Sequence, residues 1–584
     1  MPYCANPLHD GRLMTEPLIP RPAATLALLR DGERSPEVLM MRRTHLAEFA
    51  SGAYVFPGGA VDDADRDPAL VALARGTDDA QASRVLGMRE GGLAYWIAAI
   101  RECCEEAGIL LAYDRSGNLV AIEDEPRRAE FTRQRRSLAQ GRLGLADLLR
   151  EGGLTLATDK LAYLSRWITQ AGRPRRFDTR FFVARAPSRQ HSEHDGTELL
   201  DHVWLSPQEA LTRNARGEVN LLYPTVKTLQ TLARFKTVDE ALAYARADRT
   251  MPAMTPRTAT SRTGPTTLFW GDYAYAEVGK LDPDGTGAAS CEIVPGKSVR
   301  LSSRVRRITA PNPGMMTGPG TNTYLLGDAA TGVAVIDPGP AIDSHVDAIV
   351  ATAGGPIRWI FCTHTHIDHS PAAVPLKARS DATTFGMRAL HPERQDTTFQ
   401  PDKRLRHGER IEAAGCMLKV LHTPGHASNQ LCYLLEEEKL LFTGDHIMQG
   451  STVVINPPDG DMRAYLDSLN ALLAEDVAHI APGHGFLMDR LPEVVDRLVI
   501  HRRDRENKVV HALRALGPAT VGALVPTVYD DAPPQRHGIA SRSLLAHLIK
   551  LEAEGRARQA PGERWGRNRF PSPGWSSMTT WHTG

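Results

Sequence analysis

Cysteine is scarce in this sequence, and none of it is arranged as a disulfide framework. The 584 residues contain seven cysteines and no CxxC pair, and Cys103 and Cys104 lie within a helical pattern. Small secreted scaffolds depend on many paired cysteines, so this class is excluded and a reducing compartment is favoured. An excess of one charge is also missing, because Lys plus Arg and Asp plus Glu number 69 each. Overall charge therefore gives no indication of nucleic-acid or membrane binding, although a local patch would not show in the total.

Long apolar runs are absent as well. No run reaches the length of a membrane span, and the first residues lack the basic-then-apolar layout of a signal peptide. We therefore expect a cytoplasmic protein without a membrane partner. The chain is too long for one ordinary hydrophobic core, and its composition, 42% hydrophobic and 24% charged, is that of a globular protein with several domains.

The residue pattern changes several times along the chain. Two apolar runs, ATLALLR and VLMMRR, are joined by a polar turn that predicts a hairpin, and Gly92–Gly108 has the periodicity of an amphipathic helix. A stretch rich in Pro, Gly and Thr separates this region from a second alternation of strands and helices. The expected divisions are a disordered N-terminus (1–19), a first domain (20–247), a linker (248–298), a second domain (299–495), a third domain (496–560) and a disordered tail (561–584).

Ligand-type side chains follow an apolar strand in the second domain. The strand Trp359–Cys362 runs into HTHIDH, and later segments place a histidine or an aspartate beside glycine. Imidazoles and carboxylates are good zinc ligands, and two metal ions together ionise a shared water. The pattern predicts two zinc ions, the first held by His364, His366 and His426, the second by Asp368, His369 and His484, with Asp445 as a bridge. Asp368 and Asp445 are also expected to contribute to catalysis.

These positions, together with VIDPG (Val335–Gly339), resemble the metallo-β-lactamase superfamily. The resemblance implies an αββα sandwich with the zinc pair at its edge, and implies that Asp337 orients a ligand histidine. Pro311–Gly327 and His501–Gly555 are similar to the opening and the C-terminal winged helix of the β-lactamase-like protein 2 subfamily. Some members of that subfamily cut single-stranded RNA, and the superfamily also includes glyoxalase II thioesterases.

The helix predicted over Gly92–Gly108 carries three carboxylates on one face. Glu102, Glu105 and Glu106 stand at i, i+3 and i+4, where side chains are neighbours. Their mutual repulsion is relieved by a divalent cation. An ordinary solvated acidic face is the alternative for such a motif in isolation.

The same helix, preceded by FPGG (Phe56–Gly59), resembles the box of Nudix hydrolases. The resemblance implies an α/β/α sandwich in which Glu105, Glu106 and the Gly58 carbonyl hold Mg²⁺ or Mn²⁺. It also implies that Glu102 is a ligand or the base that activates water, and that Glu198 is an additional ligand or base. Asp65 stands where the box has glutamate, and a long insertion precedes Arg101. Such an insertion occurs in a subset of coenzyme A-type Nudix enzymes.

The third domain has a mild basic excess. His501–Ala560 contains ten Lys or Arg and six Asp or Glu, and winged helices often bind nucleic acid through phosphate contacts. The alternative is a domain that packs against the zinc site or forms a dimer.

The sequence as a whole predicts an α/β and α+β multidomain hydrolase with two metal centres. The zinc half would cleave an ester, thioester or phosphodiester, and the Nudix half would cleave a diphosphate, as in coenzyme A or a related nucleotide derivative. The expected partner is a small-molecule nucleotide or thioester, and the oligomeric state is left open. One alternative is a zinc-dependent endoribonuclease whose winged helix binds single-stranded RNA. Another is a degenerate Nudix module that serves only as a binding domain.

Overall fold

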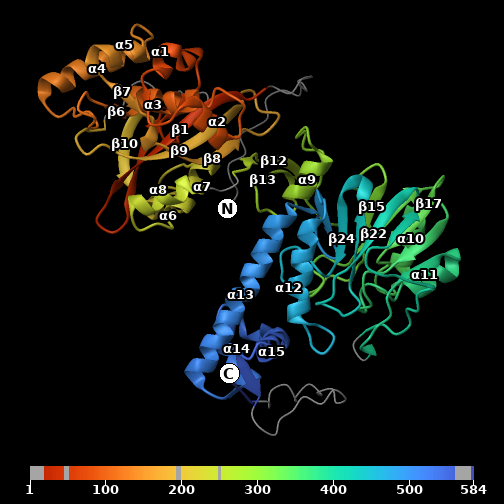
Figure 1. The fold of residues 1–584 in the computed structure, drawn as a ribbon. Coiled ribbons are helices and arrows are strands. Elements are labelled where there is room, and N and C mark those ends of the chain that lie inside the picture. The colour runs from red at the N-terminus through yellow and green to blue at the C-terminus, as the bar shows by residue number, and fades with distance from the viewer. Residues whose placement is uncertain are drawn as a thin grey trace. The chain divides into compact units, whose positions relative to one another are not determined.

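The computed structural model describes residues 19–44, 52–192, 199–247, 251–392, 395–559 and 580–583. The chain divides into two compact units (Figure 1). The first consists of Met1–Arg257 with Asp284–Thr286, and the second of Thr258–Pro283 with Gly287–Gly584. Within the described residues, no helix has both the length and the apolar character of a membrane span.

The first unit is built on a mixed sheet. The hairpin expected from the two apolar runs is present as β1 (Arg21–Asp31) and β2 (Pro36–Arg43), which are antiparallel. The sheet order is β10–β2–β1–β9–β8–β11, where β8 is Ala162–Ile168, β9 is Phe177–Arg185, β10 is Leu199–Leu205 and β11 is Ala253–Met254. Two short strands, β3 (Tyr54–Val55) and β4 (Gly58–Ala60), pair with β2 and β1.

Helices cover both faces of this sheet. Successive strand residues point to opposite faces, so Leu26 and Leu28 of β1 pack in one core while Ala27 and Leu29 pack in another. The first core contains α3 (Leu93–Ala107), α4 (Glu125–Ala139) and α5 (Leu145–Gly152). The second contains α6 (Pro207–Ala215), α7 (Tyr223–Leu232) and α8 (Val238–Arg246). The expected α/β/α sandwich is confirmed.

The insertion before Arg101 is folded into the first core. It forms a 3₁₀ turn, η1 (Asp63–Arg66), and the helices α1 (Pro68–Val71) and α2 (Asp79–Leu86). Leu70 and Ala82 are buried in the cluster that also contains the apolar side of α3. A small sheet of β5 (Ala74–Arg75), β7 (Thr155–Ala157) and β6 (Ala112–Tyr113) adjoins it. The extra residues are therefore part of the core around the carboxylate helix.

The segment expected to be a linker is largely folded. Within it, β12 (Arg257–Ser261) and β13 (Gly264–Leu268) form a two-stranded sheet, followed by α9 (Tyr275–Leu281). Glu277 of α9 is buried, pairs with Arg307 at 2.9 Å, and accepts a hydrogen bond from the Leu487 amide at 2.9 Å. A buried ion pair persists only when both partners are held in place. Most of this stretch is therefore an integral part of the second unit, for which the composition gave no signal.

The second unit contains two stacked sheets between helices. One sheet has the order β14–β15–β16–β17–β18–β19–β20, with bounds Val299–Arg300, Val305–Thr309, Asn322–Asp328, Gly332–Ile336, Ile357–Phe361, Thr383–Gly386 and Lys403–Arg404. The other has the order β21–β22–β23–β24–β25–β26, with bounds Arg410–Ala413, Cys416–His422, Leu431–Leu435, Leu440–Gly444, His479–Pro482 and Met488–Asp489.

Three apolar clusters define the layers of this unit. Ala334 and Ile336 of β17 face the core between the sheets, whereas Val333 and Val335 face α10 (Asp343–Ala353) and α11 (Ala373–Ser380). The outer face of the other sheet packs against α12 (Met462–Ala471) and the start of α13 (Leu491–Leu516). The order of layers is thus helix, sheet, sheet, helix, as expected from the sequence.

The third predicted domain begins inside a continuous helix, α13, and not after a break near residue 495. The first half of α13 packs with α12, and its second half packs with α14 (Val521–Val528) and α15 (His537–Ala553) (Figure 1). A small sheet of β27 (Ala519–Thr520), β29 (Thr580–Thr583) and β28 (Ala557–Gln559) completes the domain. Trp581 is fully buried in this core. The end of the expected disordered tail is therefore a strand, while 560–579 lie outside the described residues.

Candidate functional site

The seven predicted zinc ligands all lie in loops that follow strands of the two stacked sheets. His364, His366, Asp368 and His369 follow β18; His426 follows β22; Asp445 follows β24; and His484 follows β25. β18 and β25 each run parallel to a neighbour, β17 and β24 respectively, so these loops emerge at the carboxyl ends of paired strands. The topology thereby gathers residues more than a hundred positions apart at one edge.

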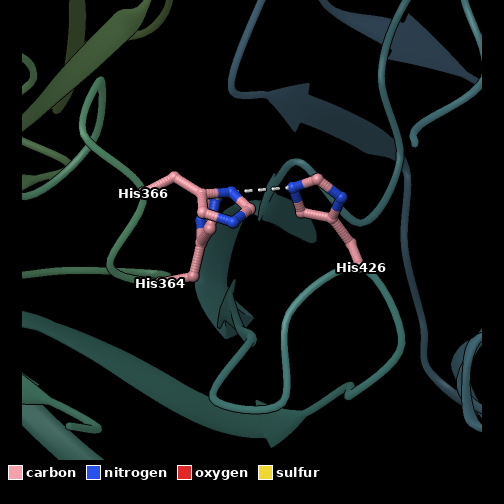
Figure 2. A group of neighbouring side chains, drawn as sticks. All are labelled: His364, His366 and His426. Carbon is pink, nitrogen blue, oxygen red and sulfur yellow. Dashed lines mark hydrogen bonds between the residues drawn. The ribbon is translucent and has the colours of Figure 1, made fainter. Parts of the chain in front are cut away.

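Three histidines converge in the first group (Figure 2). The Nε2 atoms of His364 and His426 lie 2.9 and 3.0 Å from Nδ1 of His366. One nitrogen from each ring lies within 4.8 Å of the others. Three imidazole nitrogens turned toward one point form a ligand set typical of zinc and similar cations.

The second group contains the remaining ligands. Nε2 of His369 lies 3.5 Å from Oδ2 of Asp368, and Nε2 of His484 lies 3.4 Å from the same oxygen. Asp445 stands between the groups. Its Oδ1 is 3.4 Å from His369 and 3.2 Å from His484, whereas its Oδ2 is 3.7 Å from Nε2 of His426. The geometry brings together every ligand that the sequence predicted and presents one Asp445 oxygen to each group.

Four of the predicted ligand imidazoles use Nδ1 to contact a residue outside the ligand set, and for His364 this is the Thr363 hydroxyl, at 3.0 Å. His369 Nδ1 lies 2.9 Å from Asp337 Oδ2, His426 Nδ1 lies 2.9 Å from the Val454 carbonyl, and His484 Nδ1 lies 3.2 Å from the Gly320 carbonyl. These contacts leave Nε2 free to face the centre.

Asp337, which the resemblance implied would orient a ligand histidine, is itself fixed by several hydrogen bonds. Its carboxylate also accepts hydrogen bonds from the amide and the hydroxyl of Thr363, at 2.7 and 2.8 Å. Its backbone has φ +49°, a left-handed conformation that is costly for a residue with a side chain. The surrounding bonds offset this cost and fix the carboxylate beside His369.

The charges of the two groups differ. Burial and the neighbouring imidazoles lower the pKa of His364 far below its ordinary value, and burial chiefly lowers that of His366 to about 4, so both rings are neutral donors. Burial alone would raise the pKa of Asp445, but the His484 and His369 imidazoles outweigh it and lower that pKa strongly. The same competition lowers the pKa of Asp368 to about 2. Two ionised carboxylates among imidazoles make a site that attracts positive charge.

Several buried polar atoms fit a divalent cation. Nε2 of His369, Nε2 of His484 and Oδ1 of Asp445 are buried and have no hydrogen-bond partner within the protein. Unsatisfied buried polar atoms are costly, and these three face one another. Burial lowers the pKa values of His369 and His484, but the nearby carboxylates outweigh it, raising the first well above its ordinary value and the second to about 9. The donor set, which combines imidazoles with ionised carboxylates, is therefore suited to a metal ion, which would take the place of a proton on these rings.

The carboxylates of the first unit are arranged differently. Arg101 Nη1 lies 2.9 Å from Glu102 and 3.5 Å from Glu105, while Glu106 accepts a hydrogen bond from the Gly58 amide at 2.8 Å. Burial, with Glu105 and Asp65 nearby, raises the pKa of Glu102 to about 7 against the opposing effect of Arg101. Within the described ranges, groups of three ligand atoms lying within 4.8 Å of one another occur at the histidine centre alone.

Asp65 has a partner that the sequence did not reveal. Its buried carboxylate accepts two hydrogen bonds from Arg101, from Nε at 2.9 Å and from Nη2 at 3.0 Å. Arg101 thus links Asp65 to the carboxylates of α3, and no local periodicity connects positions that far apart. Glu198, the additional ligand or base implied by the resemblance, lies outside the described residues.

Comparison with known proteins agrees with this geometry. The family model of the metallo-beta-lactamase superfamily matches residues 316–484, that of the beta-lactamase associated winged helix domain matches 520–565, and that of the NUDT19 Nudix domain matches 76–232. Both hydrolase families generally bind divalent metals.

Three curated relatives match the C-terminal half. The lactamase-like protein vrtG of Penicillium aethiopicum is 30% identical over 46% of this chain and 88% of its own length. The beta-lactamase-like protein 2 homolog of Caenorhabditis elegans is 30% identical over 44% of this chain and 86% of its own. The atrochrysone carboxyl ACP thioesterase of Aspergillus chevalieri is 30% identical over 45% of this chain and 82% of its own. The chain therefore belongs, through its C-terminal half, to the metallo-β-lactamase superfamily with its associated winged helix, and it carries a NUDT19-type Nudix hydrolase domain in its N-terminal half.

Proposed function

We propose that the C-terminal half binds two zinc ions and hydrolyses a thioester, and that the N-terminal half hydrolyses a diphosphate. The observation that carries the first part is the position of Asp445, which directs one oxygen to each of two ligand groups. His364, His366 and His426 would hold one ion, and Asp368, His369 and His484 the other. When bound, two such metal ions would supply an ionised water and stabilise the leaving oxygen or sulfur.

The chain's own residues prepare this chemistry. Asp337 fixes the His369 ring, and the Thr321 hydroxyl donates a hydrogen bond to Asp368 at 3.3 Å. Asp368 and Asp445 stay ionised, because the imidazoles beside them lower their pKa values. The site is therefore organised before substrate arrives, which reduces the reorganisation required during reaction.

Two features favour a thioester with an apolar acyl group. Ile367, between two ligands, is 72% exposed, and Met315 and Met316 of the neighbouring loop are 67% and 47% exposed. Exposed apolar side chains beside a reactive centre suit an apolar substrate group. One relative is named a thioesterase of an acyl carrier protein conjugate.

The winged helix gives less support to the RNA-cutting alternative. Ser543–Leu548 of α15 are all buried, and six consecutive residues cover every side of a helix. The helix packs between the core of its own domain and the cluster that contains α12. This favours the second interpretation of the domain, packing against the hydrolase.

For the N-terminal half, Glu105, Glu106 and the Gly58 carbonyl would hold Mg²⁺ or Mn²⁺. Glu102 would be a further ligand or the base, and Glu198 an additional one. Arg101 contacts Glu102 and Glu105 in this structure, and some of these hydrogen bonds would have to break for the metal ion to bind the same carboxylates. A nucleotide derivative such as coenzyme A offers the required diphosphate.

One substrate, an acyl-coenzyme A, tests both halves on the intact protein. Thiol release reports the zinc half and diphosphate cleavage reports the Nudix half. We expect Asp445→Ala to abolish thiol release alone and Glu105→Gln to abolish diphosphate cleavage alone, while the exposed Asp476→Ala and Glu90→Gln leave both unchanged. Elemental analysis should find two zinc ions per chain in the histidine centre. A metal-free protein, or cutting of a single-stranded RNA oligonucleotide without thiol release, would overturn the thioesterase proposal.

A further inference from the structure

The geometry points to a role for α13 and the winged-helix domain in the metal centre: they position the proposed metal ligand His426. This inference rests on the proposed metal centre. It concerns two residues, Arg502 of α13 and Ser543 of α15, that lie outside the matched metallo-β-lactamase region, 316–484. Neither residue is among the ligands. Both act through one short segment of backbone, Val453–Ile455.

The first step in the chain of contacts is the bond made by the ligand itself. His426 donates from Nδ1 to the Val454 carbonyl at 2.9 Å, which turns Nε2 toward His366. The position of that carbonyl therefore sets both the tautomer and the orientation of the ring. Any residue that fixes Val454 also fixes the ligand.

The second step is the pair of hydrogen bonds that flank Val454. The buried guanidinium of Arg502 donates to the Val453 carbonyl, and the Ile455 amide donates to Ser543 Oγ at 3.2 Å. The segment is thus held from both sides, one residue before and one residue after the carbonyl that His426 uses. Both bonds are buried, so water cannot replace them.

Packing restricts this segment further. Val453 and Ile455 are buried in the cluster that includes α12, the start of α13 and Ala546 of α15. The Arg502 guanidinium also lies over the Tyr465 ring, 5.4 Å from its centroid. In Figure 1, α13 runs from the two stacked sheets toward α14 and α15, so one continuous helix joins the winged helix to the domain that carries the histidine centre. The winged helix is therefore part of the scaffold of the metal centre.

The test measures zinc binding to the full chain, by stepwise titration against a chromophoric chelator. We expect Ser543→Ala and Arg502→Gln to weaken one of the two zinc sites by roughly 10–100-fold, the usual effect of losing an orienting contact. Ser543→Thr, which keeps the hydroxyl, should restore binding. The neighbouring Ser541→Ala and the exposed Arg503→Gln serve as matched controls and should bind zinc as the unaltered protein does. Cobalt substitution gives an independent readout, since the absorption of only one site should change.

A double-variant cycle identifies the route of the effect. In a His426→Ala background, Ser543→Ala should cause no further loss of zinc affinity, because the ligand through which it acts is gone. Equal weakening of both sites, unchanged affinity in both variants, or full additivity with His426→Ala would overturn the inference. If the unaltered protein bound no zinc, the proposed metal centre itself would fail. If the unaltered protein bound two zinc ions and the variants bound them with the same affinity, only the positioning role would fail.

Discussion

Replacing Asp65 with asparagine tests how the insertion before Arg101 contributes to the first unit. In the structure the Asp65 carboxylate is fully buried and accepts two hydrogen bonds from Arg101. It also accepts a hydrogen bond from the Asp62 amide at 2.8 Å. An asparagine has one oxygen, so its amide group would face an N–H donor of the guanidinium. Arg101 would be left with Glu102, Glu105 and, at 3.5 Å, the exposed Asp62 as charged neighbours.

The magnitude follows from the burial of the pair. Breaking a buried, doubly hydrogen-bonded ion pair costs about 3–5 kcal/mol. Part of this cost is recovered here, since Arg101 also contacts Glu102 and the Ala60 carbonyl. We expect a loss near the lower value, about 3 kcal/mol. For a unit of this size, that loss lowers the unfolding midpoint by roughly 6–12 °C.

Differential scanning calorimetry on the full chain measures the effect. The transition that shifts should belong to the first unit, and removal of metal from the histidine centre should leave that transition in place. Asp63→Asn, an exposed change in the same 3₁₀ turn, is the matched control and should shift nothing. A single Asp65→Asn variant with an unchanged midpoint would refute the reasoning.

Three further predictions concern the second unit. Asp337→Asn should weaken zinc binding roughly 10–100-fold in a chelator titration, because the buried carboxylate that orients His369 loses its charge. Burial raises the pKa of Glu506, but His547, Lys550 and Arg556 outweigh it and lower that pKa to about 2. The resulting ~1–2 kcal/mol, reduced for solvent screening, is fully present above pH 4.5 and is lost as pH falls toward 2. Trp581→Ala should cost ~3–5 kcal/mol of winged-helix stability in urea unfolding, because the ring is fully buried.

Each of these predictions has a defined contrary outcome. Zinc affinity in Asp337→Asn equal to that of the exposed Asp343→Asn would show that the carboxylate does not orient the ring. For Glu506, the stability difference between the unaltered protein and Glu506→Gln should shrink between pH 6 and pH 3; a difference independent of pH would contradict the sign derived above. A Trp581→Ala protein that unfolds at the same urea concentration would mean that the last strand adds nothing to the domain.

The sequence alone determined the families of the chain and predicted the candidate metal ligands and the local elements that carry them. The HTHIDH cluster predicted a metal centre because ligand types so close together after an apolar strand have few other uses. The helix ending at Gly108 was predictable from its period, and Gly108 indeed adopts the left-handed conformation that ends a helix. Family-model matches confirm the three families. Such signals lie within a few residues of one another, and local spacing is what a sequence displays directly.

Tertiary structure alone decided the partners that are distant along the chain. Nothing near Asp65 indicates Arg101, nothing near Glu277 indicates Arg307, and nothing near Ile455 indicates Ser543. These contacts arise because the stacking of sheets and helices brings remote segments together and closes them off from water. Once buried, each polar group must find a partner among whatever the topology places beside it. The sequence thus supplies the candidate ligands, and the fold decides which residues hold them in position.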